Sequence, residues 1–312
     1  MTVAVALAAG ACALGGAAII ARALAAWLPT IGIMDAPSPG FQERAVPRGG
    51  GLAIVIPVLL LAWLVLPQED AAARRRMLIP LSAATSVAAI SLADDICSVA
   101  VPLRLAIHVA MAVGTIALLG PIQAISTGPL GTLDLGVVAW PFSILWIVGL
   151  TNAFNFMDGI DAIAGITATV AGGAVAVASW LSGELQVGAL SLVFAAASLG
   201  FLTTNWPPAR IFMGDVGSTF CGFLLATLPL MASADNEPHL ALIVALAASP
   251  FLLDTAITLA QRLLRGDNVF QPHRRHLYQR LVLAGWSHAT VSCLYGSLAA
   301  AAAALGIFLT RP

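Results

Sequence analysis

Aspartates stand at the ends of several apolar segments of this chain, where a carboxylate is costly and is a functional candidate by default. Asp94 and Asp95 close one apolar segment, Asp158 and Asp161 close another, and Asp215 follows a third. Clustered carboxylates repel one another and raise one another's pKa values unless a cation shares the site. Mg²⁺ suits such a cluster because it takes oxygen ligands, commonly one or two carboxylates together with substrate phosphates. The alternative is that each aspartate caps a helix or pairs with an arginine.

Two further patterns place polar groups near these aspartates. Asn155, Asp158 and Asp161 are spaced by three and share one helix face if the helix continues through Gly159. The glycines around Asp215 allow backbone N–H groups at a predicted helix start to approach a phosphate closely. A glycine turn that only caps the following helix explains this second pattern equally well.

Arginines supply the opposite charge. Arg44 and Arg48 precede a glycine run, and Arg104 opens an apolar segment shortly after Asp94 and Asp95. Arginine binds phosphate bidentately, so a site for a diphosphate and a lipid phosphate needs several such side chains. The alternative is that these arginines only mark the cytoplasmic side of a membrane.

Two histidines, His273 and His276, enclose Arg274 and Arg275 in one polar segment. Their spacing and the surrounding arginines favour a functional role over an ordinary loop. A zinc site is not expected, because the other available ligands are carboxylate oxygens and the cysteines are remote.

The composition decides which elements carry these residues. The chain has 312 residues, of which 60% are hydrophobic and 9% charged, and its mean hydropathy is +0.95. A soluble domain cannot keep so little charge on its surface, so the apolar side chains must face lipid. We therefore predict an all-α, polytopic membrane bundle of about ten transmembrane helices, each of roughly 20 residues. The predicted spans are 3–28, 49–67, 77–96, 102–120, 138–156, 162–182, 186–204, 217–233, 239–261 and 287–309.

The loops between these spans leave no room for a soluble domain, so residues 1–312 are predicted to form one integral-membrane domain. Most arginines fall in the loops after the odd-numbered spans, among them Arg44, Arg104 and Arg274. By the positive-inside rule these loops are cytoplasmic and both termini are periplasmic. The aspartates described above then lie on the cytoplasmic side and can converge there.

Taken together, these motifs resemble a known family of membrane enzymes. The matching elements are Pro47–Gly51, Asp94–Asp95, Asn152–Asp161, Phe212–Ser218 and His273–Arg280. In this order they resemble the polyprenyl-phosphate N-acetylhexosamine-1-phosphate transferases of glycosyltransferase family 4. That superfamily includes the phospho-N-acetylmuramoyl-pentapeptide transferase. The resemblance implies ten or eleven helices in the bacterial inner (cytoplasmic) membrane and an active site on the cytoplasmic face.

The resemblance also implies roles for individual residues. Asp215 matches the metal-binding aspartate, with Asp95 and Asp158 near the metal, and Asp94 matches a carboxylate proposed to deprotonate the lipid phosphate. The histidine motif is implied to contact phosphate. Positions implied to line the nucleotide site are Asn155, Asp161, Asn205 and Phe212, and Arg44 and Arg48 stand roughly where a cationic nucleotide contact is expected. Arg104, Asn152 and Arg274 are further candidates for substrate binding from their place in these motifs. The implied cofactor is Mg²⁺, with Mn²⁺ as an alternative.

Two departures from the pentapeptide transferase branch narrow the expected substrate. The chain has two separated histidines where that branch has three consecutive ones, and Pro47 and Arg48 where that branch has Thr-Met. These features resemble the branch that primes O-antigen or other cell-envelope polysaccharides. The implied reaction transfers an N-acetylamino-sugar 1-phosphate from a UDP-sugar to undecaprenyl phosphate and releases UMP.

Alternatives remain open from the sequence. They are a pentapeptide transferase and, from a different class, a secondary transporter whose intramembrane carboxylates carry ions. The near-zero net charge of −1 gives no argument for nucleic acid, which is not expected as a partner. The expected partners are the UDP-sugar, the polyprenyl phosphate and membrane lipid, and a homodimer is compatible with the sequence.

Overall fold

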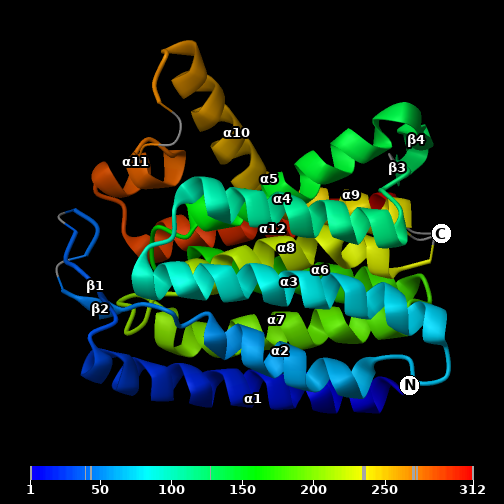
Figure 1. Ribbon diagram of the computed structural model, residues 1–312, viewed down its shortest axis with the longest axis horizontal. Coiled ribbons are helices and arrows are strands. Elements are labelled where there is room, and N and C mark those ends of the chain that lie inside the picture. Colours follow the sequence, from blue (N-terminus) through cyan, green and yellow to red (C-terminus); the bar gives the residue numbers. More distant parts are fainter. Residues whose placement is uncertain are drawn as a thin grey trace.

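Long apolar helices run side by side along most of the chain and form one bundle (Figure 1). The computed structural model describes residues 2–38, 40–42, 44–126, 128–233, 237–268, 271 and 273–310. The helices are α1 (Val3–Trp27), α2 (Leu52–Val65), α3 (Ala71–Cys97), α4 (Val101–Leu119), α5 (Ala139–Met157), α6 (Ile163–Leu181), α7 (Leu185–Asn205), α8 (Gly214–Met231), α9 (Glu237–Ala247), α10 (Ser249–Leu264), α11 (Leu277–Leu283) and α12 (His288–Leu309).

The helices account for the predicted membrane spans with two differences. Among the described residues, 8 helices are long and apolar enough to cross a membrane, and the bent pair α9–α10 brings the number to 9. The helix α2 is apolar but has only 14 residues. The predicted span over 239–261 corresponds to the pair α9–α10, which is not straight, because the two helices meet at an angle of 67°. Pro250, in the first turn of α10, has no backbone N–H with which to continue α9. The chain is a multi-pass membrane protein.

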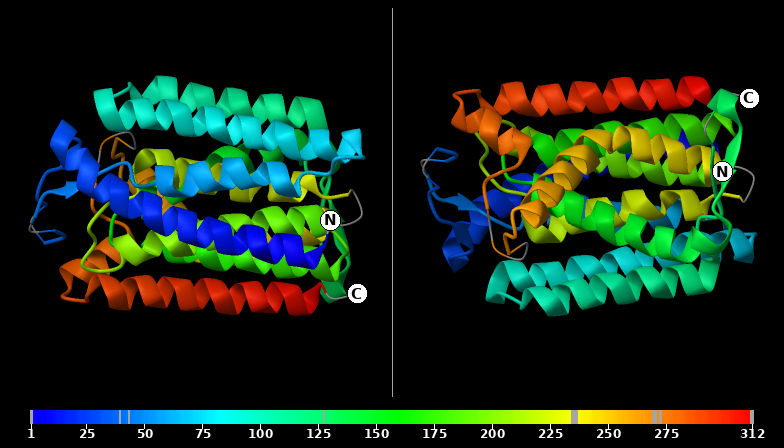
Figure 2. Two further views of the ribbon diagram at one scale, coloured as in Figure 1. Left: turned by 90° about the horizontal axis from the view of Figure 1, so that it is seen from below. Right: turned by 90° about the horizontal axis from the view of Figure 1, so that it is seen from above.

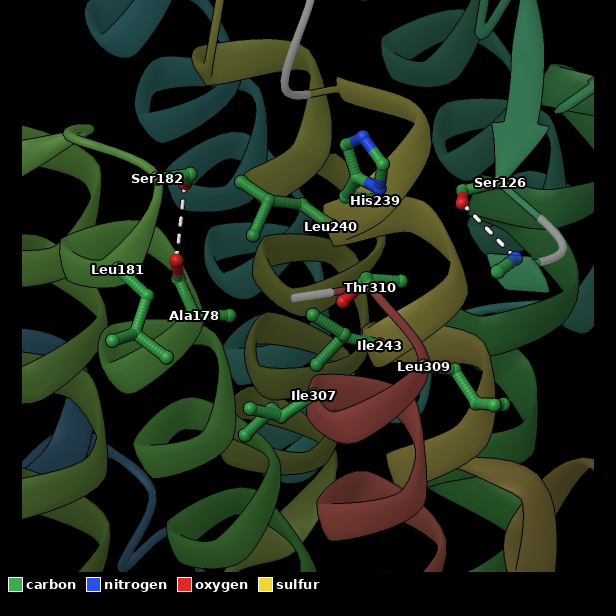
Figure 3. Close-up of a pocket in the computed structure, with 11 residues that line it drawn as sticks. Ser126, Ala178, Leu181, Ser182, His239, Leu240, Ile243, Ile307, Leu309 and Thr310 are labelled. Carbon is green, nitrogen blue, oxygen red and sulfur yellow. Dashed lines mark hydrogen bonds between the residues drawn. The ribbon is translucent and has the colours of Figure 1, made fainter. Parts of the chain in front are cut away.

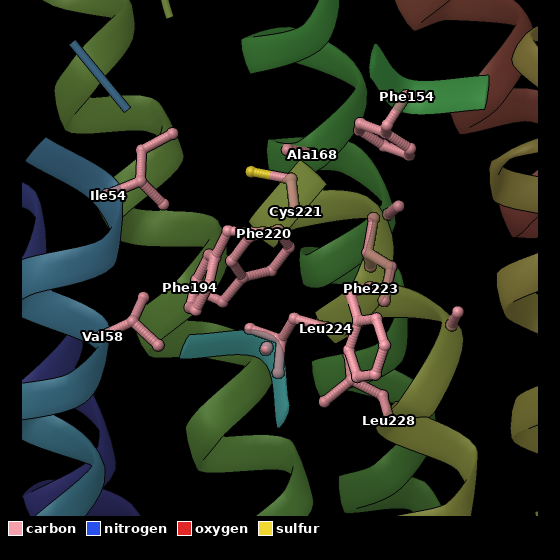
Figure 4. Close-up of a cluster of buried hydrophobic side chains, with 14 of the residues drawn as sticks. Ile54, Val58, Phe154, Ala168, Phe194, Phe220, Cys221, Phe223, Leu224 and Leu228 are labelled. Carbon is pink, nitrogen blue, oxygen red and sulfur yellow. The ribbon is translucent and has the colours of Figure 1, made fainter. Parts of the chain in front are cut away.

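The helix α8 lies at the centre of the bundle, and all its residues from Val216 to Met231 are buried. A helix that is apolar on every side has to be surrounded by other helices. Its aromatic and leucine side chains share one buried cluster with side chains of α2, α5 and α7 (Figure 4). The outer helices instead expose large apolar side chains, such as Leu60 and Trp63 of α2. Lipid is the solvent that such faces require.

The two ends of the bundle differ in character (Figures 1 and 2). One end carries the C-terminal ends of α3, α5 and α7 and the N-terminal ends of α4 and α8, so the predicted site residues gather there. The start of α1 and the end of α12 lie at the opposite end. That this opposite end is periplasmic stays a prediction.

Two short hairpins add strands that an all-helical expectation did not include. The strands β1 (Met34–Asp35) and β2 (Val46–Pro47) pair antiparallel at the site end. The strands β3 (Ala124–Ser126) and β4 (Thr132–Asp134) pair antiparallel at the other end. The helix α10 projects away from the bundle, with α11 nearby (Figure 1).

Candidate active site

A cavity of about 190 Å³ opens at the site end of the bundle, and we call it the carboxylate pocket. Its lining residues come from five separate parts of the chain, and four of these residues are aspartates. The lining consists of Asp35, Phe41, Gln42, Arg48, Asn155, Asp158, Gly159, Ile160, Asp161, Asn205, Phe212, Gly214, Asp215 and His288.

The end of α5 brings three predicted polar residues to this pocket. The helix ends at Met157 and Asp158 takes a non-helical conformation, so the helix does not continue through Gly159 and the three residues share no single helix face. The chain turns at Gly159, where a Cβ atom would lie 2.1 Å from the Tyr278 hydroxyl oxygen. Asn155, Asp158 and Asp161 nevertheless all line the pocket, because the turn folds back over the end of the helix.

Asp95 holds the end of α3 against the start of α8. Its two carboxylate oxygens accept hydrogen bonds from the backbone N–H groups of Asp215 (3.1 Å) and Val216 (3.0 Å). A carboxylate at a helix N-terminus is stabilised by the orphan N–H groups and by the helix dipole. The Asp95 side chain is only 1% exposed and lines neither pocket described here. The structure therefore gives Asp95 a capping role, and its predicted place near the metal stays a prediction.

Glycines allow the backbone before α2 to pack closely against the backbone at the start of α8. The N–H groups of Gly50 and Gly51 donate to the carbonyl oxygens of Phe212 (2.8 Å) and Met213 (2.7 Å). A Cβ atom on Gly51 would lie 2.2 Å from the Cα atom of Gly217. Asp95 binds the N–H groups of Asp215 and Val216 at the start of α8, and the approach of a phosphate to the other N–H groups there stays a prediction.

Asp161 and Asn205 fix the loops around the same pocket. Asn205 accepts a hydrogen bond from the Ala162 N–H at 2.9 Å. Asp161 Oδ2 accepts one from the Ala209 N–H at 3.1 Å and lies 3.3 Å from His288 Nδ1. His288 also lines the pocket.

A second cavity, of about 310 Å³, lies between α4, α10 and the segment after α10, and we call it the basic pocket. It combines cationic and imidazole side chains with apolar and hydroxyl-bearing walls. The lining consists of Val101, Arg104, Phe156, Thr255, Thr258, Leu259, Arg262, Gln271, His273, His276 and Gln279. A cavity of this kind can take a phosphate that carries an apolar chain.

Asp254, which the sequence analysis overlooked, positions the histidine segment. Its Oδ1 accepts from the Leu277 N–H at 2.8 Å and lies 3.3 Å from His276 Nδ1. Its Oδ2 accepts from the Tyr295 hydroxyl at 2.7 Å and from the Tyr278 N–H at 3.2 Å. A carboxylate inside an apolar segment was the signal that could have identified it.

His273 stacks on His276, with ring centroids 5.0 Å apart. Burial, and next the positive charge of Arg262, lower the pKa of His273 to about 4. The imidazole is therefore neutral near pH 7, and it can donate or accept one hydrogen bond at each nitrogen according to its tautomer.

Arg104 joins the two pockets. Its Nη1 contacts both Asp94 Oδ2 and Asp215 Oδ2. Arg104 lines the basic pocket, whereas Asp215 lines the carboxylate pocket. Asp94 is engaged on both sides, because its other oxygen accepts from the Val99 N–H at 2.6 Å.

Residues 77–233 match the sequence profile of glycosyl transferase family 4. A probable undecaprenyl-phosphate N-acetylglucosaminyl 1-phosphate transferase of Bacillus subtilis (strain 168) is 31% identical over 272 residues, which are 83% of this chain and 72% of the relative. The chain belongs to glycosyl transferase family 4. A phospho-N-acetylmuramoyl-pentapeptide-transferase of Anoxybacillus flavithermus (strain DSM 21510 / WK1) is 32% identical over 181 residues, 57% of this chain and 53% of the relative.

This membership confirms the resemblance inferred from the motifs. It also rejects the alternative of a secondary transporter, which the intramembrane carboxylates had left open. The carboxylates gather at one end of the bundle, as the family resemblance implied, whereas transporters bind near the bilayer midplane.

Three predicted contact residues lie apart from both pockets. Arg44 is exposed beside β2. Asn152 donates to the Val148 carbonyl oxygen of its own helix at 2.8 Å. Arg274 lies over the Phe41 ring, 5.0 Å from its centroid, and donates to Ser38 Oγ at 2.6 Å. Arg274 thus connects the histidine segment to the loop between β1 and β2, whose Phe41 lines the carboxylate pocket.

The charges of the carboxylate pocket fit a divalent cation. Its lining has four aspartates facing Arg48 and the imidazole of His288. Burial and then repulsion by Asp215 and Asp95 raise the pKa of Asp158 well above its ordinary value, and no hydrogen bond from the described residues offsets this. Burial likewise raises the pKa of Asp35, which the sequence analysis overlooked, although Arg48 lies 3.5 Å away.

No three described His, Cys, Asp or Glu side chains converge on one point as a preformed metal cage. Mg²⁺ bound by one or two carboxylates, with substrate phosphates completing its shell, does not need such a cage. The four carboxylates of the carboxylate pocket supply oxygen ligands of the type that Mg²⁺ or Mn²⁺ takes.

A larger cavity, of about 410 Å³, lies at the opposite end of the bundle (Figure 3). Its described lining has hydroxyl groups, apolar side chains and His239, without a carboxylate or an arginine. It lacks the charges that phosphate or metal chemistry requires, so size alone does not identify the active site.

Proposed function

We propose that this enzyme transfers an N-acetylamino-sugar 1-phosphate from a UDP-sugar to undecaprenyl phosphate. The observation that carries the proposal is the contact of Arg104 with Asp215, which joins an acidic pocket to a basic one. A reaction between a metal-bound diphosphate and a lipid phosphate needs two such sites in contact. The name of the Bacillus subtilis relative describes this class of reaction.

The donor binds in the carboxylate pocket. Asp158 and Asp215 are the residues that would hold Mg²⁺, with Mn²⁺ as an alternative, and the bound ion would neutralise the donor diphosphate. Phe41, Phe212 and Asn205 supply aromatic and amide surfaces for the nucleotide. Arg48, held by Asp35 and by the Asp95 carbonyl oxygen at 2.8 Å, supplies positive charge beside it.

The acceptor phosphate binds in the basic pocket, and its polyprenyl chain leaves between α4 and α10 toward lipid. Arg104 and Arg262 offer cationic donors, and the paired imidazoles of His273 and His276 offer neutral ones. Val101, Leu259 and Phe156 provide the apolar wall that an isoprenoid chain requires.

In the reaction, an oxygen of the lipid phosphate attacks the phosphorus next to the sugar. The bond from that phosphorus to the bridging oxygen breaks, and UMP leaves with the bridging oxygen and its electrons. Positioning and charge neutralisation do most of the work in such a transfer. A phosphate monoester has a second pKa of about 6 and is largely ionised at neutral pH, so a base is not essential. We assign Asp94 chiefly to holding Arg104, and its predicted role as a base stays a prediction.

A two-step route through an aspartyl-phosphate is the chemical alternative. It predicts that UMP is released from the UDP-sugar when no lipid acceptor is present. Direct transfer predicts no UMP until acceptor is added.

In this proposal the active site lies on the cytoplasmic face of a bacterial inner membrane, because UDP-sugars are found in the cytoplasm. The product is a polyprenyl-diphosphate-linked sugar that starts an O-antigen or another cell-envelope polysaccharide. The Anoxybacillus flavithermus relative keeps a pentapeptide transferase as a second candidate. A homodimer stays a prediction.

Purified protein incubated with radiolabelled UDP-sugars, Mg²⁺ and undecaprenyl phosphate tests the proposal. We expect a lipid-extractable labelled product with a UDP-N-acetylamino sugar, and none with the Asp215→Asn variant. A product formed only from UDP-N-acetylmuramoyl-pentapeptide would assign the enzyme to the second candidate. Failure to label lipid with either donor would refute the proposal.

A further inference from the structure

Arg104 has more binding capacity than its present partners use. One terminal nitrogen, Nη1, serves both Asp94 and Asp215. The Nε atom of Arg104 is buried and has no hydrogen-bond partner among the described residues. A guanidinium has five N–H donors and stays protonated, so a buried one is stable only with acceptors for its charge.

The two carboxylates that hold Arg104 differ in their surroundings. Asp94 is anchored by the Val99 N–H and its side chain is 17% exposed. Asp215 is 28% exposed, lines the carboxylate pocket and is the residue proposed above for the divalent cation. One guanidinium and one divalent cation therefore compete for the carboxylate of Asp215.

Because Arg104 also lines the basic pocket, release from Asp215 leaves its charge beside the place proposed for the acceptor phosphate. Asp94 can remain its partner and act as a pivot. The Nε–H group is one unengaged donor in that arrangement, and a phosphate can accept two parallel hydrogen bonds from one edge of a guanidinium group.

We propose that Arg104 is an exchangeable counter-ion that couples the two pockets. It neutralises Asp215 when the carboxylate pocket is empty, and it becomes available to the acceptor phosphate when a divalent cation and nucleotide occupy that pocket. Donor binding thereby strengthens acceptor binding, and the coupling is reciprocal by thermodynamic necessity. This inference rests on the proposed function and goes beyond it, because catalysis alone does not require the two bindings to be coupled.

The test measures binding of decyl phosphate, a soluble acceptor analogue, to purified protein by isothermal titration calorimetry. For wild-type protein, Mn²⁺ with UMP should tighten decyl phosphate binding by about tenfold, within the usual range for coupled sites. The Asp215→Asn variant, although inactive, should bind decyl phosphate about tenfold more tightly than wild type without Mn²⁺ or UMP, because Arg104 is already released.

The matched control is Asp35→Asn, which removes one negative charge from the same pocket but does not touch Arg104. It should change decyl phosphate binding by less than about twofold, as expected for a screened charge at longer range. If Asp215→Asn and Asp35→Asn changed the affinity for decyl phosphate equally, the loss of one negative charge would explain both changes, and the proposal would be overturned.

A second variant keeps the proposal testable if Asp215→Asn does not fold. Arg104→Gln should bind Mn²⁺ more tightly than wild type, measured by electron paramagnetic resonance of the free ion, because the competing cation is gone. Its weak binding of decyl phosphate should not respond to Mn²⁺ and UMP. Retained coupling in Arg104→Gln would overturn the proposal.

Measured turnover without coupling would refute only this inference, whereas absence of both turnover and decyl phosphate binding would refute the proposed function as well.

Discussion

The carboxylate of Asp95 accepts a hydrogen bond of 3.1 Å from the backbone N–H of Asp215. Two aspartates that the sequence placed in one metal site therefore have different tasks, one in the backbone framework and one in the cavity. Substitutions at single residues can test these separate roles.

The first prediction concerns the cap on α8. Asp95→Ala leaves the N–H groups of Asp215 and Val216 without acceptors, and each unsatisfied buried donor costs about 1–3 kcal/mol. We expect a lower midpoint of thermal unfolding in detergent and a loss of turnover. The control is Glu69→Gln, an exposed carboxylate between α2 and α3 that should leave both unchanged. An Asp95→Ala variant with wild-type stability would contradict the capping role.

The second prediction concerns glycine packing. Gly51→Ala adds a methyl group that would lie 2.2 Å from the Cα atom of Gly217, so the start of α8 must shift. Overpacking of this kind costs about 1–3 kcal/mol or more. Gly15→Ala in α1 meets no atom within 4 Å and should be neutral or slightly stabilising. Unfolding curves of both variants, recorded by intrinsic tryptophan fluorescence, measure the difference.

The third prediction concerns Asp254, which lines neither the carboxylate pocket nor the basic pocket but contacts His276 in the wall of the basic pocket. Asp254→Ala removes the acceptor that holds the Leu277 and Tyr278 N–H groups and orients His276. We expect the KM for polyprenyl phosphate to rise about tenfold or more while the KM for UDP-sugar changes little, since only the basic pocket loses support. An equal rise in both KM values would argue against separate donor and acceptor pockets.

The fourth prediction concerns pH. The folded-state pKa of His273, about 4, lies below its ordinary value of 6.5. The unfolded chain therefore binds a proton more readily, so the stability contributed by neutral His273 is complete above pH 6.5 and declines as the pH falls from about 6.5 to 4. His273→Gln should flatten the pH dependence of the unfolding midpoint in that window. The variant should not alter the shape of the activity profile between pH 7 and 8, because His273 is already neutral there.

Much of the architecture could be predicted from the sequence because the signals are local. A span such as α7 is recognised by a run of apolar residues as long as the bilayer is thick, whatever its neighbours are. The bend between α9 and α10 was not predicted, and whether the helix of α5 continues through Gly159 was left open. Pro250 could have indicated the bend, but Gly159 ends α5 against Tyr278, a contact between distant segments.

The sequence by itself determined that this is a membrane helix bundle, that it belongs to its family, and that carboxylates and arginines collect at one end. These properties follow from composition, segment length and motif order. Only the tertiary structure decided that Asp95 caps a helix and that Arg104 links two cavities. It also decided that Asp35 lines the carboxylate pocket, that the Asp158 side chain lies there without a hydrogen-bond partner among the described residues, and that Asp254 holds the histidine segment. The physical reason is that a carboxylate's role depends on which N–H group or cation lies within about 3 Å of it. That neighbour comes from another segment, placed there by the packing of helices far apart along the chain.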